Sequence, residues 1–349
     1  MYDLWEHAQL GPLTLRNRTV RSATNEHLAE PDGQFTHIWA DTLIELAQNQ
    51  VGLVITGHVC VDRDQRADEG QPVLDSRAGL DLLRRAAEGV HLCGSRLVMQ
   101  LSHSGPKALP QVNGRPAKAP EDFSPLELDR LVLQFVQAAQ LCLQAGLDGV
   151  QIHCAHGYLL SSFLNPQGNR RTDQYGGSLE NRFRLPARIL REIRAACGPR
   201  FALLVKIDAN GSGDLHRLLE LLRETGVDGA EISGVDFNTR PGCKKPFYLE
   251  EAAAAQASTA LPLILVGGIF SRTDAEQVLA AGIPFVSFSR ALICQPDFVA
   301  RLRSGELDES ACLACNGCYS IYRRRPVRCV QHSAPIPQLE KVFRGIQLE

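Results

Sequence analysis

The feature that most constrains the fold is a repeated alternation of short apolar segments with longer amphipathic ones. The apolar segments are nearly continuous, as expected for parallel strands that are covered on both faces. We predict strands at Thr19–Ala23, Leu53–Gly57, Leu97–Leu101, Gly149–His153, Leu203–Ile207, Ala230–Ser233, Leu263–Val266 and Phe285–Phe288. We predict helices at His37–Asn49, Arg77–His91, Leu126–Ala145, Leu179–Ala196, Leu215–Glu224 and Arg272–Ala280. Eight strand–helix units predict an α/β fold, a closed (β/α)8 TIM barrel.

The segments outside this repeat extend the barrel. Leu10–Leu15 precedes the first strand and predicts a small N-terminal hairpin that plugs the barrel floor. Residues 102–124 and 155–178 form long connections after the third and fourth strands, and long loops in compact domains are usually functional. We therefore expect a barrel domain at 1–303 and a cysteine-rich C-terminal tail at 304–349, packed on the barrel or extending from it.

The composition restricts the classes of binding partner and the cellular compartment that we expect. The formal net charge of −2 gives no basic excess for nucleic acid or anionic lipid. The N-terminus carries Asp3 and Glu6, which argues against a signal peptide, and apolar runs such as Pro262–Val266 are far shorter than the ~20 residues that cross a bilayer. The eleven cysteines are an odd number without an export signal and so favour reduced thiols. We expect a cytoplasmic protein without nucleic-acid or membrane partners, and leave open a homo-oligomer.

Polar residues gather at the predicted carboxyl ends of the strands, where barrel active sites lie. Two imidazoles and a phenol crowd the end of strand four, as His153, His156 and Tyr158. Two such donors can hold a substrate carbonyl oxygen, and a tyrosine can give up a proton. The alternatives are a metal-binding pair, which has no obvious further ligands nearby, and histidines that merely pack in the core.

The last two units predict a phosphate site. Gly267 and Gly268 follow strand seven, and Ser289 and Arg290 follow strand eight. Backbone amides at a glycine turn, a helix N-terminus and an arginine can cradle a phosphate, and barrels often use these two loops for that purpose. The alternative is a tight turn with a surface arginine.

A long motif at strand four carries a family resemblance. The chain reads His153-Cys-Ala-His-Gly-Tyr-Leu and continues to Asn169-Arg-Arg-Thr-Asp-Gln-Tyr-Gly-Gly-Ser-Leu-Glu-Asn-Arg182, with Gln100-Leu-Ser-His-Ser-Gly105 and Val266-Gly-Gly-Ile269 elsewhere. From about Leu15 to about Arg303 the sequence resembles the old yellow enzyme family of NADH:flavin oxidoreductases. The cysteine-bearing tail looks similar to the 2,4-dienoyl-CoA reductase branch, in a short single-barrel form.

The resemblance implies a non-covalent FMN in the barrel, reduced by NADH or NADPH. Ala23 and Thr24 would contact the flavin ring, Gln100 its pyrimidine edge and Lys206 its N1/C2 side; a lysine paired with Asp208 or Glu231 is the alternative. Gly267, Gly268, Ser289 and Arg290 would take the phosphate. The stretch Asn25-Glu26-His27 departs from the family, where a cysteine or threonine and a tyrosine often lie beside the flavin.

The same resemblance implies an ene-reductase. His153 and His156 would bind the carbonyl of an α,β-unsaturated small-molecule substrate. Hydride would pass from the flavin to the β-carbon, and Tyr158 would protonate the α-carbon. Three alternatives remain: flavin-dependent amine oxidation or N-demethylation, a non-redox phosphate-binding barrel lyase or aldolase with Lys206 as Schiff-base nucleophile, and a thiol-tail sensor or electron carrier.

Four cysteines crowd the tail as Cys312, Cys315, Cys318 and Cys329. Their spacing of two, two and ten intervening residues suits a zinc ion or an iron–sulfur cluster. In the dienoyl-CoA reductase branch a similar tail binds a 4Fe-4S cluster, with the last two intervals each one residue longer. The alternative is a set of reduced thiols packed on the barrel.

Overall fold

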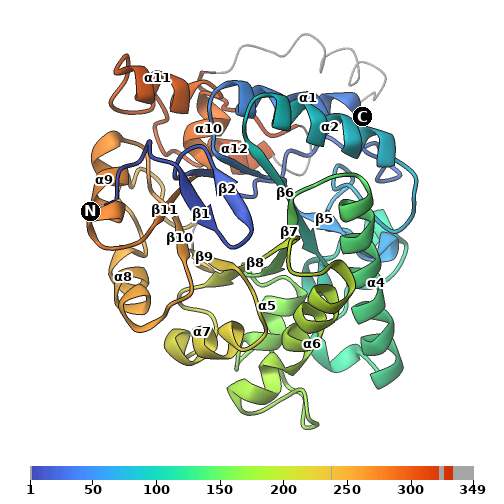
Figure 1. The fold of residues 1–349 in the computed structure, drawn as a ribbon. Helices are drawn as coiled ribbons and strands as arrows, with labels where there is room; N and C mark the ends of the chain where they lie inside the picture. Colours follow the sequence, from blue (N-terminus) through green and yellow to red (C-terminus); the bar gives the residue numbers. More distant parts are fainter. Residues whose placement is uncertain (1, 237, 322–325, 333–349) are drawn as a thin grey trace.

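Eight parallel strands close into a barrel in the computed structural model, which describes residues 2–236, 238–321 and 326–332 (Figure 1). Each strand pairs with the next along the chain, and the last pairs with the first. The predicted TIM barrel is confirmed, and each predicted strand overlaps an observed one. The barrel strands are β3 (Thr19–Arg21), β4 (Leu53–Ile55), β6 (Arg96–Ser102), β7 (Gly149–Cys154), β8 (Ala202–Asp208), β9 (Gly229–Ser233), β10 (Leu263–Val266) and β11 (Phe285–Phe288). A short strand, β5 (Val59–Cys60), also pairs with β6.

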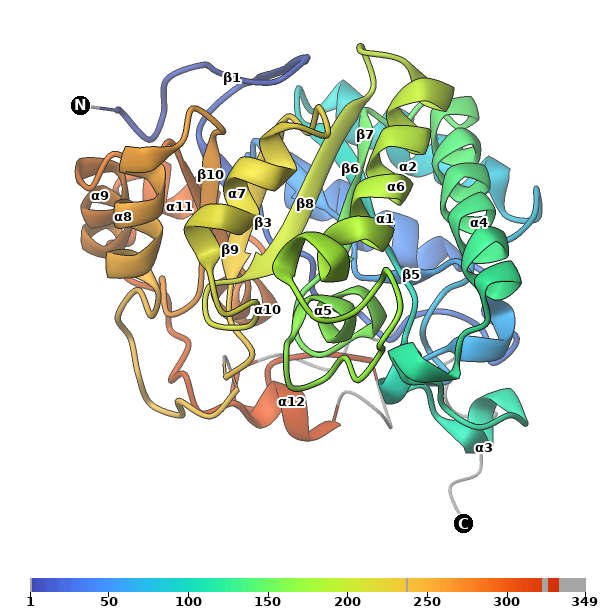
Figure 2. The same cartoon turned by 90° about the horizontal axis from the view of Figure 1, so that it is seen from below.

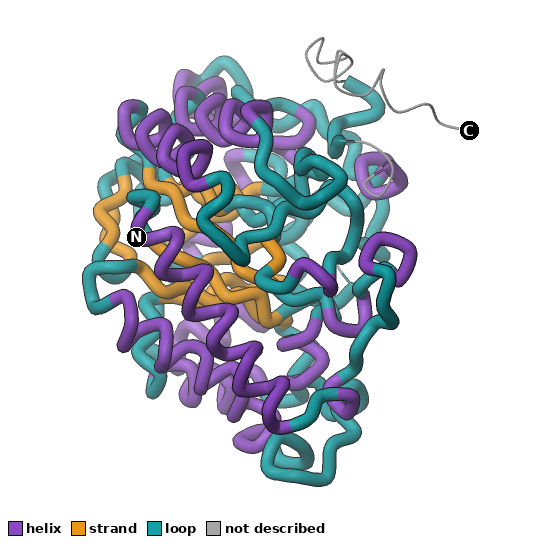
Figure 3. The backbone as a smooth tube through the Cα atoms, turned by 90° about the vertical axis from the view of Figure 1, so that its right-hand side faces the viewer, coloured by secondary structure: helices purple, strands orange, loops and turns teal. Residues whose placement is uncertain are grey.

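Helices surround the strands and cover their outer faces (Figure 3). The helices that sequence patterns predicted are α1 (His37–Gln48), α2 (Leu80–Leu92), α4 (Pro125–Gln144), α6 (Leu179–Cys197), α7 (Leu215–Arg223) and α9 (Arg272–Ala280). Helix α2 begins three residues later than predicted because Gly79 has a φ of 86° and cannot belong to a right-handed helix. Helix α8 (Leu249–Ser258) escaped prediction because its alanine-rich sequence lacks a clear apolar stripe.

The predicted N-terminal hairpin is present as β1 (Ala8–Leu10) paired antiparallel with β2 (Leu13–Leu15). Its leucines pack in one buried cluster with barrel residues such as Val20 and Phe285. A Cβ added at Gly229, the first residue of β9, would lie 2.8 Å from Leu10 Cδ1. The hairpin therefore closes the amino-terminal end of the barrel and leaves the opposite end for a site.

Long connections and helix α12 (Gly317–Ile321) of the tail lie at the carboxyl end of the strands (Figure 2). The connection after β6 holds η2 (Gly105–Lys107), α3 (Pro110–Asn113) and η3 (Pro120–Asp122), and the one after β7 holds α5 (Leu159–Leu164). Arg182 stabilises the connection after β7 by donating hydrogen bonds to the carbonyls of Leu164, Gly177 and Ser212. Within the family-like block, this arginine has a structural role.

The chain after β11 continues through α10 (Arg290–Cys294), α11 (Phe298–Ser304) and α12 (Gly317–Ile321). The N–H of Ser310 donates to the carbonyl of Phe270, and that of Val327 donates to Glu26. The described part of the predicted tail thus contacts the segments that follow β10 and β3, while 322–325 and 333–349 lie outside the described residues. The helices that the structure describes include none long and apolar enough to traverse a bilayer.

Candidate active site

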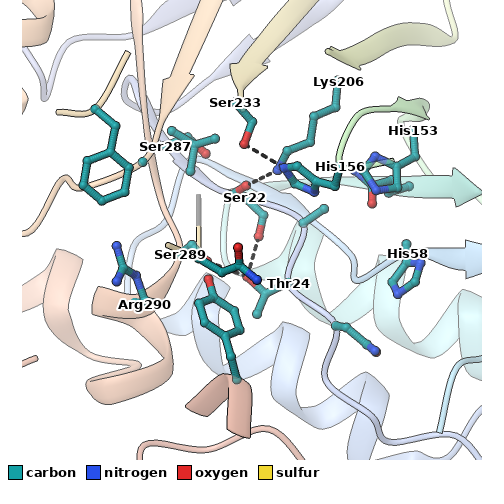
Figure 4. A pocket seen from close by; sticks show the side chains of 18 of the residues that line it. Ser22, Thr24, His58, His153, His156, Lys206, Ser233, Ser287, Ser289 and Arg290 are labelled. Carbon is teal, nitrogen blue, oxygen red and sulfur yellow. Dashed lines mark hydrogen bonds between the residues drawn. The ribbon is translucent and has the colours of Figure 1, made fainter. Parts of the chain in front are cut away.

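A cavity of about 1310 Å³, counting space open to solvent, lies at the carboxyl ends of the strands (Figure 4). All of the predicted cofactor and catalytic residues of the barrel line it: Ala23, Thr24, Gln100, His153, His156, Tyr158, Lys206, Gly267, Gly268, Ser289 and Arg290. The fold therefore brings together residues from the ends of six different strands.

The two histidines and the tyrosine form one cluster at the end of β7. The ring centroid of His153 lies 5.2 Å from that of His156 and 4.9 Å from that of Tyr158. His156 has a φ of 64°, a left-handed conformation that is costly for a residue other than glycine. The Asp208 carboxylate stabilises this turn by accepting the backbone N–H of His156 at 2.9 and 3.0 Å.

Burial sets the charge of this cluster. It lowers the pKa of both His153 and His156 well below the ordinary value, with smaller contributions from neighbouring rings and lysines. Both rings are therefore neutral at physiological pH, so each has one N–H donor and one acceptor. His156 Nε2 lies 2.8 Å from Ser233 Oγ. His153 Nδ1 is buried and has no hydrogen-bond partner within the described structure.

Lys206 is buried at the mouth of the barrel, as its position on β8 predicts. Its Nζ donates a hydrogen bond to Ser22 Oγ at 2.7 Å and lies 3.4 Å from Glu231 Oε2. Of the two carboxylates considered from sequence, Glu231 is thus the ion-pair partner. Burial raises the pKa of the other, Asp208, to about 6.

Glu231 connects Lys206 to the predicted flavin contact on β6. Gln100 Nε2 donates to Gln151 Oε1 at 2.7 Å, and Gln151 Nε2 donates to Glu231 Oε2 at 3.0 Å. Ser287 Oγ donates to the other oxygen of Glu231. This network links the lysine on β8 to the amide on β6, and both line the cavity.

The predicted phosphate residues meet on the other side of the cavity. Ser289 Oγ lies 3.1 Å from Thr24 Oγ1, and Arg290 donates to Asn316 Oδ1 in the tail. The glycine pair has a local steric reason as well, since a Cβ at Gly268 would lie 1.8 Å from the carbonyl oxygen of Lys245. The predicted glycine turn is present, and Arg290 is buried, whereas the alternative expected a surface arginine.

The unusual stretch Asn25-Glu26-His27 forms a buried ion pair and a buried histidine–aspartate contact. Glu26 pairs with Arg21 at 2.5 Å, and His27 Nδ1 lies 3.0 Å from Asp68 Oδ1. Asn25 donates to the same aspartate and also lines the cavity. The departure from the family pattern therefore has a structural basis in this chain.

Sequence reasoning missed several residues that line the cavity: His58, Lys107, Tyr319 and Val327. His58 follows β4, so the rule that barrel sites lie at strand ends could have found it. Its ring centroid lies 4.9 Å from that of Tyr158, and burial lowers its pKa to about 4. Lys107 belongs to a loop, and Tyr319 and Val327 belong to the tail, where no periodic signal fixes position.

The four predicted metal-binding cysteines, Cys312, Cys315, Cys318 and Cys329, line one small cavity beside Arg290. Burial raises the pKa of the Cys318 thiol to about 11. Among the described residues, no group of three or more histidine, cysteine or acidic side chains is arranged to hold a metal ion. The cluster or zinc ion remains a prediction.

Comparisons with known proteins agree with this architecture. Residues 3–309 match the model of the NADH:flavin oxidoreductase / NADH oxidase family. The chain is 30% identical to an NADH oxidase from Thermoanaerobacter brockii over 99% of its own length, but spans only 58% of that relative. It is also 30% identical to a 4,4'-dithiodibutanoate disulfide reductase from Rhodococcus erythropolis, covering 95% of this chain and 96% of the relative.

Among solved structures, an old yellow enzyme homologue from Zymomonas mobilis superposes with a TM-score of 0.77 at 23% identity. The superposition covers 93% of this chain and 99% of the other. At this identity the likeness concerns the fold, and it supports the barrel and its flanking elements.

Proposed function

We propose that the chain, which belongs to the NADH:flavin oxidoreductase / NADH oxidase family, is an ene-reductase. Membership of this family implies FMN as the cofactor and NADH or NADPH as the reductant. The reaction would convert an α,β-unsaturated carbonyl compound, NAD(P)H and a proton to the saturated carbonyl compound and NAD(P)+. The observation that carries this proposal is the buried Nδ1 of His153, which has no hydrogen-bond partner among the described residues and lies in the ring cluster with Tyr158.

The residues present fit FMN by the chemistry of their donors. One region of the cavity has the Arg290 guanidinium and the Ser289 hydroxyl, which suit a phosphate. Another has the Lys206 ammonium and the Gln100 amide, which suit the polar edge of the flavin ring. Held by these residues, FMN would supply hydride transfer from the nicotinamide to the β-carbon of the substrate.

The protein would supply orientation and protons. An unpartnered polar atom buried in a protein costs about 1–3 kcal/mol, so a substrate oxygen at His153 would recover part of that cost. His156, held by Asp208, would supply the second donor to the same oxygen. Tyr158 would then give its hydroxyl proton to the α-carbon as the hydride arrives at the β-carbon.

Two features speak against the alternative functions. A Schiff-base lyase needs a neutral lysine, whereas Lys206 has a buried carboxylate partner. An amine substrate favours a site with acidic side chains, and none of the described residues that line the cavity is acidic. Both observations favour a substrate with an electron-rich oxygen.

Anaerobic spectroscopy tests the proposal directly. Freshly purified protein should have flavin absorption bands that bleach on addition of NADH or NADPH and return when 2-cyclohexenone is added. A colourless protein that cannot be loaded with FMN would overturn the proposal, as would a reduced protein that no enone oxidises. The same spectrum, before and after dithionite, reveals any additional broad absorption from an iron–sulfur cluster in the tail.

A further inference from the structure

The C-terminal tail binds one edge of the Arg290 guanidinium. Within the part of the chain that the structure describes, all side-chain hydrogen bonds of Arg290 come from Nη1, which donates to Asn316 Oδ1 and lies 3.5 Å from the carbonyl oxygen of Ala314. Nε and Nη2 together form a second edge, of the kind that binds a phosphate through two parallel hydrogen bonds. Arg290 is buried and lines the main cavity (Figure 4), so the tail holds one edge and leaves the other for a ligand.

The amide of Asn316 has a defined orientation. Its Nδ2 donates to the carbonyl of Asn238, in the connection between β9 and α8, at 3.0 Å. Its Oδ1 therefore faces Arg290 and accepts. A rotated amide would direct its NH2 group at a guanidinium, which has only donors. The side chain of Asn316 thus joins three segments that lie far apart in the sequence.

The tail loop that carries this asparagine has an uncommon backbone. Ala314 and Asn316 have φ angles of 52° and 60°, in the left-handed region that alanine rarely adopts and asparagine tolerates better. The N–H of Gly242 donates to the Ala314 carbonyl at 2.9 Å, and a Cβ added at Gly317 would lie 2.5 Å from Cγ2 of Val330. Such conformations persist where surrounding contacts hold them, and they cluster at ligand-binding sites.

Two aromatic rings complete the surroundings of the guanidinium. Cζ of Arg290 lies 5.0 Å from the ring centroid of Phe270 and 5.6 Å from that of Phe247. Cation–π contacts of this kind are attractive, but they do not select which nitrogens point towards a ligand. The directed contact comes from Asn316.

We propose that Asn316 is a positioning residue. By binding Nη1, it directs Nε and Nη2 of Arg290 towards the phosphate of the flavin. The tail thereby contributes to the selection of FMN over riboflavin, which has the same ring system and no phosphate. This inference rests on the proposed phosphate-binding role of Arg290 and extends it to the tail.

Titration of the full-length, flavin-free protein with FMN and with riboflavin tests this proposal. Asn316→Gly removes the amide and keeps a residue that adopts a φ of 60° readily, so the loop backbone is not strained by the change. The variant should bind FMN about 10-fold more weakly than the parent protein, since the charge of Arg290 remains and only its alignment is lost. Its Kd for riboflavin should stay within about twofold. Flavin fluorescence reports both constants.

A double substitution separates positioning from an independent effect. If Asn316 acts through Arg290, adding Asn316→Gly to Arg290→Gln should weaken FMN binding by less than about twofold beyond the loss in Arg290→Gln alone. Two losses that multiply in full would overturn the proposal. Ser320→Ala is the matched control in the tail, because it removes an exposed hydroxyl that donates to the Gly317 carbonyl. It should leave both flavin affinities within about twofold.

The comparison of the two flavins also distinguishes the possible failures. Equal weakening of FMN and riboflavin in Asn316→Gly would indicate a general loss of the cavity wall and overturn the positioning role, as would unchanged FMN affinity. If the parent protein binds FMN and riboflavin equally well, the phosphate-binding role of Arg290 is wrong. If it binds neither flavin, the proposed flavin-dependent function is wrong.

Discussion

Lys206 and Glu231 form a buried ion pair inside the barrel, with Nζ 3.4 Å from Oε2 and side chains that are 3% and 0% exposed. The carboxylate is held by Gln151 and Ser287 as well, so each of its oxygens has a hydrogen-bond donor. Such a pair costs desolvation energy, and its retention at a cavity wall is consistent with a functional cation.

Removing the carboxylate charge should therefore destabilise the protein. We expect Glu231→Gln to lower the free energy of unfolding by about 3 kcal/mol, because it leaves Lys206 buried without its counter-ion. Glu180→Gln, which breaks an exposed pair with Arg217, should cost less than about 1 kcal/mol. Urea denaturation at fixed protein and FMN concentrations measures both, and equal losses would argue against a buried pair.

If Tyr158 is the proton donor, its substitution should affect only one of the two half-reactions. Tyr158→Phe should slow oxidation of the reduced protein by an enone about 100-fold or more, since general acid catalysis typically contributes that much. Reduction by NADH or NADPH needs no proton from this phenol and should change little. Stopped-flow absorbance records each step, and a similar loss in both would count against the assignment.

Arg290 should determine FMN affinity. Loss of a charge-assisted contact with the phosphate in Arg290→Gln should weaken FMN binding about 10- to 100-fold. Arg303→Gln alters a surface arginine that bonds to Gln50 and serves as the control. Fluorescence titration of the flavin-free protein gives both dissociation constants, and unchanged affinity in Arg290→Gln would remove this residue from the site.

His58 gives a stability that depends on pH. Burial lowers its folded-state pKa to about 4 from an unfolded value of 6.5, so the unfolded chain binds the proton first as pH falls. The stabilising contribution is complete above pH 6.5 and is lost as pH falls towards 4, by about 3 kcal/mol in total at 1.36 kcal/mol per pH unit. Between pH 6.5 and 4 the free energy of unfolding of the parent protein should fall more steeply than that of His58→Gln. Equal pH dependence of the two unfolding free energies would contradict the assignment.

The barrel could be predicted from sequence because its strands are buried on both faces and read as unbroken apolar runs; β10 and β11 match their predicted ranges. The strand-end residues followed from the same alternation, and so did the shared cavity. Lys107 and Tyr319 could not be found in this way. Their positions depend on contacts between segments far apart in the chain, such as Lys107 against Gly157.

The sequence also could not distinguish a structural role from a chemical role for individual residues. Gly268 fits a phosphate cradle and is equally required by the approach of Lys245. A lysine at strand five can attack a carbonyl or balance a charge, and only the nearby Glu231 favours the second role. One-dimensional patterns give residue types and spacing, while these choices depend on three-dimensional neighbours.

The hydrogen bond from Val327 to Glu26 has a consequence for biosynthesis. The two residues lie at opposite ends of the chain, and both Val327 and Tyr319 line the cavity together with Ala23 and Thr24. Closing contacts between such distant residues is slow. A ribosome would have to release residue 327 before the wall of this cavity could be completed, so the pocket is finished only after all eight barrel strands have been synthesised.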